Sequence, residues 1–289
     1  MKTWKKILAV AFCGAIAATL AACSGGAASS DSSAASGDSS AASSDSSATA
    51  GDSSAAAGDY KLVKDGTLTV ITSADYPPFE SMEGDKIVGF DAELIREVGK
   101  RIGLDVEISN QAFDTLITSV AGGSAADVAI SAITIDPDRA NDVDFSESYY
   151  DSNLAIVVLK DAKMTASDVN AAKTALDGLP VGAQSGTSGE AWIEENLSGN
   201  AYTPYQETPD LLNQLRTGAI QAAVYDQPVA EAHVNGEYDD CEILAVIPTG
   251  EQYGIAVNKD NAALTAAIDK ALEEIKSDGT MDKLLTANL

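Results

Sequence analysis

From residue 59 to the C-terminus, the chain alternates short runs rich in β-branched residues with stretches whose apolar residues recur at helical spacing. This alternation is typical of the α/β class, in which helices cover both faces of parallel sheets. The roughly 230 residues of this region suffice for one large or two medium-sized domains with their own cores. The predicted strands span residues 67–72, 127–131, 154–159, 222–225, 243–247 and 254–257, with a short strand near Val181. The predicted helical stripes include Phe90, Leu94, Val98 and Ile102, and Leu264, Ile268, Leu272 and Ile275.

The N-terminus has the layout of a secretory signal. Lys2, Lys5 and Lys6 precede an apolar run over residues 7–20, and small residues then lead to Cys23. The run has roughly 14 residues, whereas a helix needs roughly 20 to cross a bilayer. The sequence therefore favours a cleaved signal over a retained membrane anchor.

The end of this run, Leu20-Ala21-Ala22-Cys23, resembles the bacterial lipobox. In that motif the cysteine thiol receives a diacylglyceryl group, and the peptide bond before it is cut. We therefore predict a signal peptide over residues 1–22 and a lipidated Cys23, because two or more acyl chains give stable membrane attachment. The alternative is an ordinary signal with an incidental cysteine, since small residues also suit ordinary cleavage.

A low-complexity segment separates Cys23 from the rest of the chain. Residues 24–58 contain only Ser, Ala, Gly, Asp and Thr, none of which could form a core. We predict a disordered tether over residues 23–59, with an end-to-end span on the order of 30 to 35 Å. A spacer without any selected length would have the same composition.

Charge and cysteine content exclude several classes of function. Removal of residues 1–22 takes away three lysines and no acids, so the formal charge moves from -26 to -29. Such an acidic chain is not expected to bind nucleic acid. Cys241 would be the one cysteine left unmodified, so no disulfide is predicted, and we interpret it as a buried apolar residue. No metal-ligand spacing or dinucleotide fingerprint is present, so no cofactor is predicted.

Polar and aromatic side chains follow four predicted strands, at the strand ends where open α/β sheets bind ligands. The first such segment is Tyr76-Pro77-Pro78-Phe79-Glu80, in which paired prolines stiffen the turn. Tyr76 is a candidate to cover the apolar stem of a ligand. Alternatively, its ring packs against its own lobe.

The second segment continues from the strand at 127–131 to Arg139. Thr134 offers hydrogen-bond donors, and the planar guanidinium of Arg139 matches a carboxylate in bidentate fashion. The alternative is a surface arginine that pairs with Asp136 or Asp142.

The third segment, Gln184-Ser185-Gly186-Thr187-Ser188-Gly189-Glu190, opens a helical stretch whose free N–H groups can meet an anion. An ordinary helix N-cap at Thr187 or Ser188 is the alternative. In the fourth segment, Asp226 can accept hydrogen bonds from an ammonium group, or it can cap the helix that Pro228 begins. An arginine, an anion-accepting loop, a carboxylate and an aromatic wall together complement a zwitterion.

Four stretches resemble the polar amino-acid-binding proteins of ABC importers, which form family 3 of the bacterial extracellular solute-binding proteins. They are Tyr76-Pro77-Pro78-Phe79-Glu80, Gly89-Phe90-Asp91-Ala92-Glu93-Leu94, residues 127–139 and Asp144-Phe145-Ser146-Glu147-Ser148-Tyr149-Tyr150. The resemblance runs from about residue 62 to the C-terminus. It implies a two-lobe, type II periplasmic-binding-protein-like α/β fold with two crossover hinge strands. The first lobe would comprise residues 60–153 and 255–289, and the second lobe residues 154–254.

The resemblance also implies which residues contact the ends of the ligand. Arg139 matches the arginine that clamps the α-carboxylate, assisted by Thr134, by the backbone at Ala132 and by the N–H of Ser188. Asp226 matches the acid that receives the α-ammonium group.

Other matched positions concern the side chain of the ligand. Tyr76 and Phe113 match aromatic positions that line the side-chain pocket. Ser73 stands where several relatives carry an acid, with Asp75 two residues later. The remaining predicted contacts are Gln184 and Tyr225, at positions that vary with the ligand, and Thr187 beside Ser188.

The implied function is that of a monomeric, membrane-anchored extracytoplasmic lipoprotein that captures a polar or basic L-amino acid by hinge closure and works with a membrane permease. The main alternative is a dehydratase-like enzyme on the same scaffold, with Glu80 or Glu190 as a general base. That alternative lacks a nucleophile and base pair, and the one histidine, His233, is expected to be solvent-exposed. A sensory input domain is the third possibility, although such domains normally continue into a membrane-spanning segment.

Overall fold

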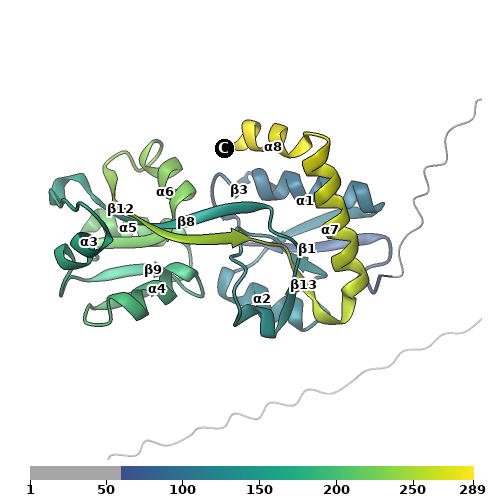
Figure 1. Ribbon diagram of the computed structural model, residues 1–289, viewed down its shortest axis with the longest axis horizontal. Coiled ribbons are helices and arrows are strands. Elements are labelled where there is room, and N and C mark those ends of the chain that lie inside the picture. The colour runs from purple at the N-terminus through teal and green to yellow at the C-terminus, as the bar shows by residue number, and fades with distance from the viewer. Residues whose placement is uncertain (1–59) are drawn as a thin grey trace, which may run out of the picture. The chain divides into compact units, whose positions relative to one another are not determined.

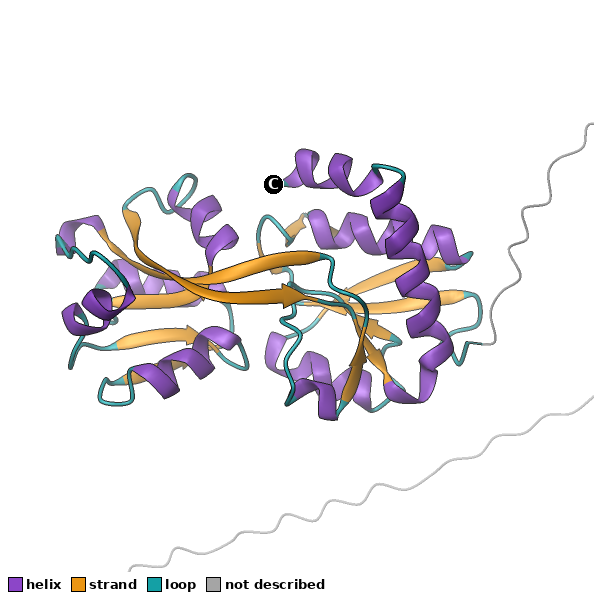
Figure 2. Cartoon of the chain, viewed as in Figure 1, coloured by secondary structure: helices purple, strands orange, loops and turns teal. Residues whose placement is uncertain are grey.

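The computed structural model describes residues 60–289, which belong to one compact unit. The predicted signal peptide at 1–22, the lipidated Cys23 and the tether at 23–59 lie outside the described residues. Within residues 60–289, no helix combines the length and the hydrophobicity needed to span a membrane. The described chain folds around two five-stranded sheets, and each sheet is the centre of one lobe (Figures 1 and 2).

The first lobe surrounds a sheet with strand order β5-β1-β6-β13-β7. Its strands are β1 (Thr67–Thr72), β5 (Asp105–Asn110), β6 (Val128–Ala129), β7 (Val143–Phe145) and β13 (Ala256–Asn258). Its helices are α1 (Phe90–Ile102), α2 (Phe113–Ala121), α7 (Ala262–Ser277) and α8 (Thr280–Asn288). A small antiparallel sheet joins it, with β2 (Asp75–Tyr76), β3 (Glu80–Glu83) and β4 (Lys86–Val88).

The second lobe surrounds a sheet with strand order β10-β9-β11-β8-β12. Its strands are β8 (Tyr150–Leu159), β9 (Val181–Gln184), β10 (Tyr202–Tyr205), β11 (Ala222–Asp226) and β12 (Cys241–Tyr253). Its helices are α3 (Val169–Ala175), α4 (Ser188–Asn196), α5 (Thr208–Thr217) and α6 (Gln227–Val234). Short 3-10 turns span Arg139–Asn141, Lys160–Ala162 and Lys259–Asn261.

Both sheets are mixed, so the prediction of parallel sheets was wrong in part. Strand β1 pairs in parallel with β5 and β6, but β13 is antiparallel to β6 and β7. In the second lobe β9 is parallel to β10 and β11, whereas β8 is antiparallel to β11 and β12. The chain enters the second lobe through β8 and returns to the first lobe through β12 and β13, and the antiparallel pairs involve these strands. The local sequence pattern does not predict the direction in which a returning strand pairs.

Strands β8 and β12 pair along their length and run from one lobe to the other (Figure 1). The register joins Tyr150 to Tyr253 at one end and Leu159 to Cys241 at the other. Both strands are longer than the predicted ones at 154–159 and 243–247. The lobe boundary expected at 153/154 lies inside β8, and the one expected at 254/255 follows the end of β12.

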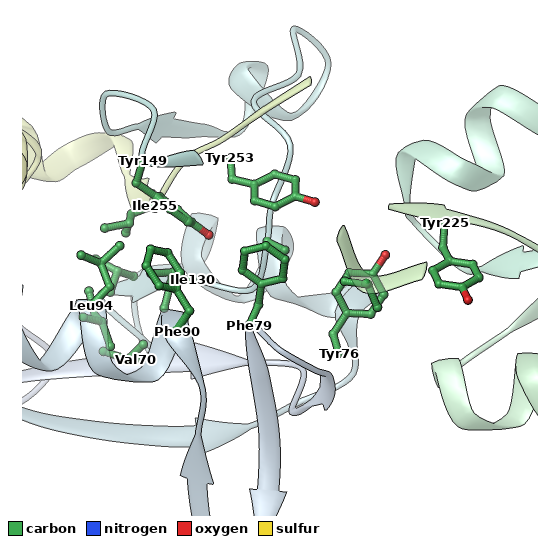
Figure 3. Close-up of a cluster of buried hydrophobic side chains, with 14 of the residues drawn as sticks. Val70, Tyr76, Phe79, Phe90, Leu94, Ile130, Tyr149, Tyr225, Tyr253 and Ile255 are labelled. Carbon is green, nitrogen blue, oxygen red and sulfur yellow. The ribbon is translucent and has the colours of Figure 1, made fainter. Parts of the chain in front are cut away.

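The core of the first lobe centres on aromatic rings (Figure 3). Phe79 lies edge-on to Phe90 and to Tyr253, with ring centroids 6.0 and 5.3 Å apart. Gly89 makes this approach possible, because its φ is 111° and a Cβ there would lie 2.4 Å from the Phe79 carbonyl oxygen. The predicted helical stripes are confirmed as core, since each of their residues in α1 and α7 is buried.

His233 is buried, with 7% of its surface exposed, so the prediction of a solvent-exposed histidine was wrong. Its ring centroid lies 5.8 Å from that of Tyr225 and 5.2 Å from that of Tyr238. Burial lowers the pKa of His233 to about 4. The polar neighbours that motivated the prediction, Asn235 and Gly236, follow the end of α6, whereas Val229 and Ala230 within the helix share the buried face of His233. Cys241 is buried and free, as predicted.

Candidate functional site

A cavity between the lobes brings together ten of the eleven predicted ligand-binding residues, with Ser131 in addition. They follow the carboxyl ends of β1, β6, β9 and β11 or begin α2 and α4, where the sequence pattern placed them. The lining residues are Ser73, Tyr76, Phe113, Ser131, Ala132, Thr134, Arg139, Gln184, Thr187, Ser188 and Asp226.

The cavity is nearly shut in this structure. The free volume of the cavity is about 10 Å³, which is room for about one water molecule. Next to it lies a wider groove of about 680 Å³, which shares Thr134, Arg139, Thr187 and Ser188 with the cavity. The lobes therefore stand in a closed arrangement, and a larger guest requires them to separate.

Arg139 begins the 3-10 turn after β6 and contacts both lobes. Its guanidinium donates to the carbonyl of Thr134 at 2.8 Å and, across the cleft, to the carbonyl of Gly186 at 2.8 Å. Its Cζ atom lies 5.6 Å from the centroid of the Phe113 ring. Burial lowers the pKa of Arg139, and nearby carboxylates, Asp226 among them, oppose that shift.

The structure does not support the alternative that Arg139 is a surface residue paired with Asp136 or Asp142. Within residues 60–289 its guanidinium forms no ion pair with Asp136 or Asp142. Asp136 instead accepts a hydrogen bond from the backbone N–H of Arg139 at 3.2 Å. The guanidinium thus faces the cavity, hydrogen-bonded to two carbonyl groups and with N–H donors to spare.

Asp226 ends β11 and supplies the negative charge of the cavity. The Tyr76 hydroxyl donates to its Oδ2 at 2.5 Å, and the backbone N–H of Asp226 donates to the Tyr76 hydroxyl at 3.0 Å. The other oxygen, Oδ1, is buried and accepts no hydrogen bond. Burial raises the pKa of Asp226, against the effects of Tyr76 and Arg139. The side chain makes no cap bond to α6, so the alternative of a cap alone is excluded.

The loop before α4 is both a helix cap and part of the cavity wall. The Thr187 hydroxyl accepts from the N–H of Glu190 at 3.3 Å and donates to the carbonyl of Gln184 at 2.7 Å. Glu190 in turn accepts from the N–H of Gly186 at 2.6 Å. The first N–H groups of a helix have no partner within it, so Ser188 presents a donor at the cavity.

The other end of the cavity is polar and joins the lobes through Asp75. Its Oδ2 accepts from the backbone N–H of Thr208 at 2.8 Å and from the Gln184 amide at 3.3 Å. Its Oδ1 accepts from the Ser73 hydroxyl at 2.8 Å. Burial raises the pKa of Asp75. The carboxylate of Asp75 therefore lies next to Ser73, but it already accepts a hydrogen bond from the N-terminus of α5.

Sequence reasoning missed Ser131 and Glu251. Glu251 lies on β12, and its Oε2 is 3.4 Å from the Thr134 hydroxyl and 3.2 Å from the Ser188 hydroxyl, one in each lobe. Burial, together with the charge of Asp226, raises the pKa of Glu251 to about 7. Glu251 was missed because the residues around it in the sequence are polar, so the apolar pattern did not predict that β12 continues through this position.

Tyr225 is the one predicted contact that does not line the cavity. It is 3% exposed and packs in the second lobe beside His233, and its buried hydroxyl accepts and donates no hydrogen bond. Strand alternation explains this, because Tyr225 precedes Asp226 on β11 and so points to the opposite face of the sheet. Figure 3 shows Tyr225 on the second lobe, apart from the rings around Phe79.

Comparison with known proteins gives consistent matches over the described chain. The family described as bacterial extracellular solute-binding proteins, family 3, matches residues 68–288. The arginine-binding extracellular protein ArtP of Bacillus subtilis (strain 168) is 35% identical over 218 residues, which is 74% of this chain and 82% of that protein. The L-cystine-binding protein TcyJ of Escherichia coli (strain K12) is 31% identical over 228 residues, 78% of this chain and 83% of that protein. The solved structure of an ancestral arginine-binding protein bound to arginine has a TM-score of 0.72 and 35% identity, covering 78% of this chain and 98% of that one.

Proposed function

Because the chain belongs to the bacterial extracellular solute-binding proteins, family 3, we propose that it captures a polar or basic L-amino acid, with L-arginine as the first candidate. The protein is the amino-acid-binding component of an ABC importer and hands its ligand to a membrane permease. It is not an enzyme, since relatives matched over most of their length are binding proteins.

One observation carries the proposal: Arg139 and Asp226 bring opposite charges into one cavity, and each keeps hydrogen-bonding capacity. Arg139 has donors to spare, and Asp226 has a buried oxygen without a donor. A carboxylate and an ammonium group on the same ligand would satisfy both. The N-terminus of α4 adds donors to the carboxylate end.

Charge around the cavity supports a basic side chain. The groove beside the cavity is rimmed by acids, with Arg139 as its one basic residue. An acidic groove attracts cationic solutes and raises their local concentration. The acids are Asp136, Asp138, Glu190, Glu194, Glu195 and Glu251. The relative named for arginine supports the same choice, and the relative named for cystine supports a wider polar class.

We infer that ligand enters by separation of the lobes about β8 and β12, which would make 153/154 and 254/255 the effective boundaries. The first lobe contributes Tyr76 and Arg139, and the second contributes Asp226 with the loop before α4. The contacts of Arg139 with Gly186 and of Tyr76 with Asp226 cross between the lobes and would break on opening. Hinge closure around a ligand is the expected motion of such proteins.

A panel of the common L-amino acids, with ornithine and cystine, tests the proposal by thermal shift and calorimetry. L-Arginine at about 100 times its Kd is expected to stabilise the protein by about 2.7 kcal/mol. NMR of the mixture should show the amino acid unchanged, which separates capture from turnover. Stabilisation by acidic amino acids alone, or by none, would contradict the proposal.

We also propose that Cys23 is lipidated and that the protein acts as a monomer. The lipobox-like residues before Cys23 support the first point. We expect Cys23→Ala to move the protein from the membrane fraction to the soluble fraction, because the acyl chains supply the attachment. Unchanged fractionation would contradict lipidation. In the described chain few large apolar residues are exposed, which supports a monomer; they are Val63, Met82, Val246 and Leu289.

A further inference from the structure

Two carboxyl groups lie buried directly behind the cavity, joined by hydrogen bonds to residues of its wall. Glu80 begins β3 and is 1% exposed, and Asp91, in the first turn of α1, is 0% exposed. Among residues 60–289, neither takes part in an ion pair. A buried carboxylate without a cation requires hydrogen-bond donors or a proton.

The donors around the two groups are unequal. Asp91 Oδ2 accepts from the backbone N–H of Ala132 at 2.7 Å and from the Tyr149 hydroxyl at 2.8 Å. Glu80 Oε1 accepts from the Ser131 hydroxyl at 2.9 Å. The remaining oxygens, Glu80 Oε2 and Asp91 Oδ1, are buried and receive no donor from any other group. The donors of the two groups, Ser131 and Ala132, are adjacent in the chain, so the carboxyl groups lie side by side and a single proton between them satisfies both.

The surroundings indicate which group keeps this proton. Asp91 has two donors and lies at the N-terminus of α1, and both features favour its charged form. Burial and the charge of Asp91 raise the pKa of Glu80 well above its usual range, whereas burial raises the pKa of Asp91 to about 6. The other titratable groups that face the pair are Asp75 and Tyr149, and neither supplies a positive charge.

The hydrogen bonds of the pair end on the wall of the cavity. The Ser131 hydroxyl donates to Glu80 and accepts from the backbone N–H of Ser73 at 3.0 Å. Ser131 and Ser73 both line the cavity. Ala132, held by Asp91, has a φ of 46°, in the left-handed region that residues with a Cβ disfavour. Such a conformation persists only where its surroundings fix it.

We propose that Glu80 and Asp91 share one proton and act as a positioning pair, which holds the backbone at Ser131 and Ala132 in the geometry that receives the carboxylate of the bound amino acid. The inference rests on the proposed function and adds two residues to its site. The ring of Phe90 packs against those of Phe79 and Tyr149 (Figure 3). Tyr149 also donates to Asp91, so this aromatic cluster adjoins the buried pair.

Glu80→Gln tests the proposal. The glutamine amide can donate to Asp91 and its carbonyl can accept from Ser131, so the contacts remain while the titrating proton is removed. The proton of Glu80 is present at low pH and is lost as pH rises through its raised pKa, which leaves two adjacent buried charges in the wild type only. The ratio of the wild-type Kd for L-arginine to the Glu80→Gln Kd is therefore expected to rise about tenfold or more as the pH is raised from about 6 through the raised pKa of Glu80.

The ratio removes effects common to both proteins, including titration of L-arginine itself and of Glu251. Glu83→Gln is the matched control, because Glu83 lies on the same strand but is exposed, and its ratio should stay constant. Asp91→Asn leaves Glu80 as the one ionisable carboxyl group of the pair, so two adjacent charges cannot form and the same rise as for Glu80→Gln is expected; the test therefore survives if one variant fails to fold.

The outcomes separate the two hypotheses. A wild type that binds no amino acid contradicts the proposed function and this inference with it. A wild type that binds L-arginine, with a Kd ratio that stays flat for Glu80→Gln and Asp91→Asn, contradicts the positioning pair alone. Circular dichroism at each pH shows whether a lost affinity reflects unfolding.

Discussion

Replacing Arg139 with alanine is expected to weaken L-arginine binding by about a hundredfold or more while the fold survives. Removal of one partner of a buried, hydrogen-bonded charge pair raises the free energy of binding by roughly 2 to 5 kcal/mol, and about 1.4 kcal/mol corresponds to tenfold. In the free protein the same guanidinium contacts two carbonyls and no carboxylate, so its loss should change the free energy of unfolding by less than about 1 kcal/mol. Calorimetry and thermal denaturation measure the two effects.

The control ligand for this variant is agmatine, which is arginine without its carboxylate. If Arg139 receives the carboxylate, Arg139→Ala should leave the weaker affinity for agmatine nearly unchanged. Arg96→Ala is the matched protein control, because Arg96 also donates to a backbone carbonyl, that of Ile87 at 2.8 Å, away from the cavity. Equal losses for L-arginine and agmatine would show that Arg139 acts only by closing the lobes through Gly186.

Elements whose signal is local were predictable from the sequence. Strand β1 has the predicted bounds, because its β-branched run ends at Thr72, directly before Ser73. The stripes of α1 and α7 are buried, since helical period alone decides which face is apolar. The direction of β13 was not predictable in this way, because it depends on the return of the chain from the second lobe.

The hinge strands were predicted too short for a physical reason. Glu251 in β12 lines the groove beside the cavity, and it pairs with Ser152 in β8, next to Asn153, which accepts from the N–H of Gly250. A strand that passes a polar cleft does not need alternating apolar residues there. The apolar pattern in the sequence therefore covers a shorter stretch than the backbone hydrogen bonds between the two strands. Glu251 was missed with it.

The candidate site followed from strand ends and family motifs, but its supporting contacts did not. Glu80 was considered as a general base of an enzyme, whereas the structure buries it against Asp91. That contact, like the one between Asp75 and Thr208, joins residues that are distant in the sequence and depends on the packed fold. Whether the cavity residues contact a ligand stays a prediction, which the variants at both ends of the cavity test.

The variant at the opposite end, Asp226→Asn, is expected to weaken L-arginine binding by about a hundredfold, because the ammonium group loses its charged acceptor. Its control ligand is 5-guanidinopentanoate, which is arginine without the α-ammonium group. That ligand should bind Asp226→Asn as well as or better than the wild type, since its carboxylate no longer faces the negative charge of Asp226. Asp226→Asn and Arg139→Ala are thus expected to give opposite patterns with the two truncated ligands.

Tyr76→Phe separates the charge of Asp226 from its place in the interlobe contact. The substitution removes the hydroxyl that donates to Asp226 but keeps the carboxylate, so its effect on L-arginine should stay within about tenfold. Calorimetry with both ligands measures each affinity. If Asp226→Asn lost 5-guanidinopentanoate as strongly as L-arginine, Asp226 would serve closure of the lobes and not the ammonium group, and a zwitterion would no longer be the guest that this cavity selects.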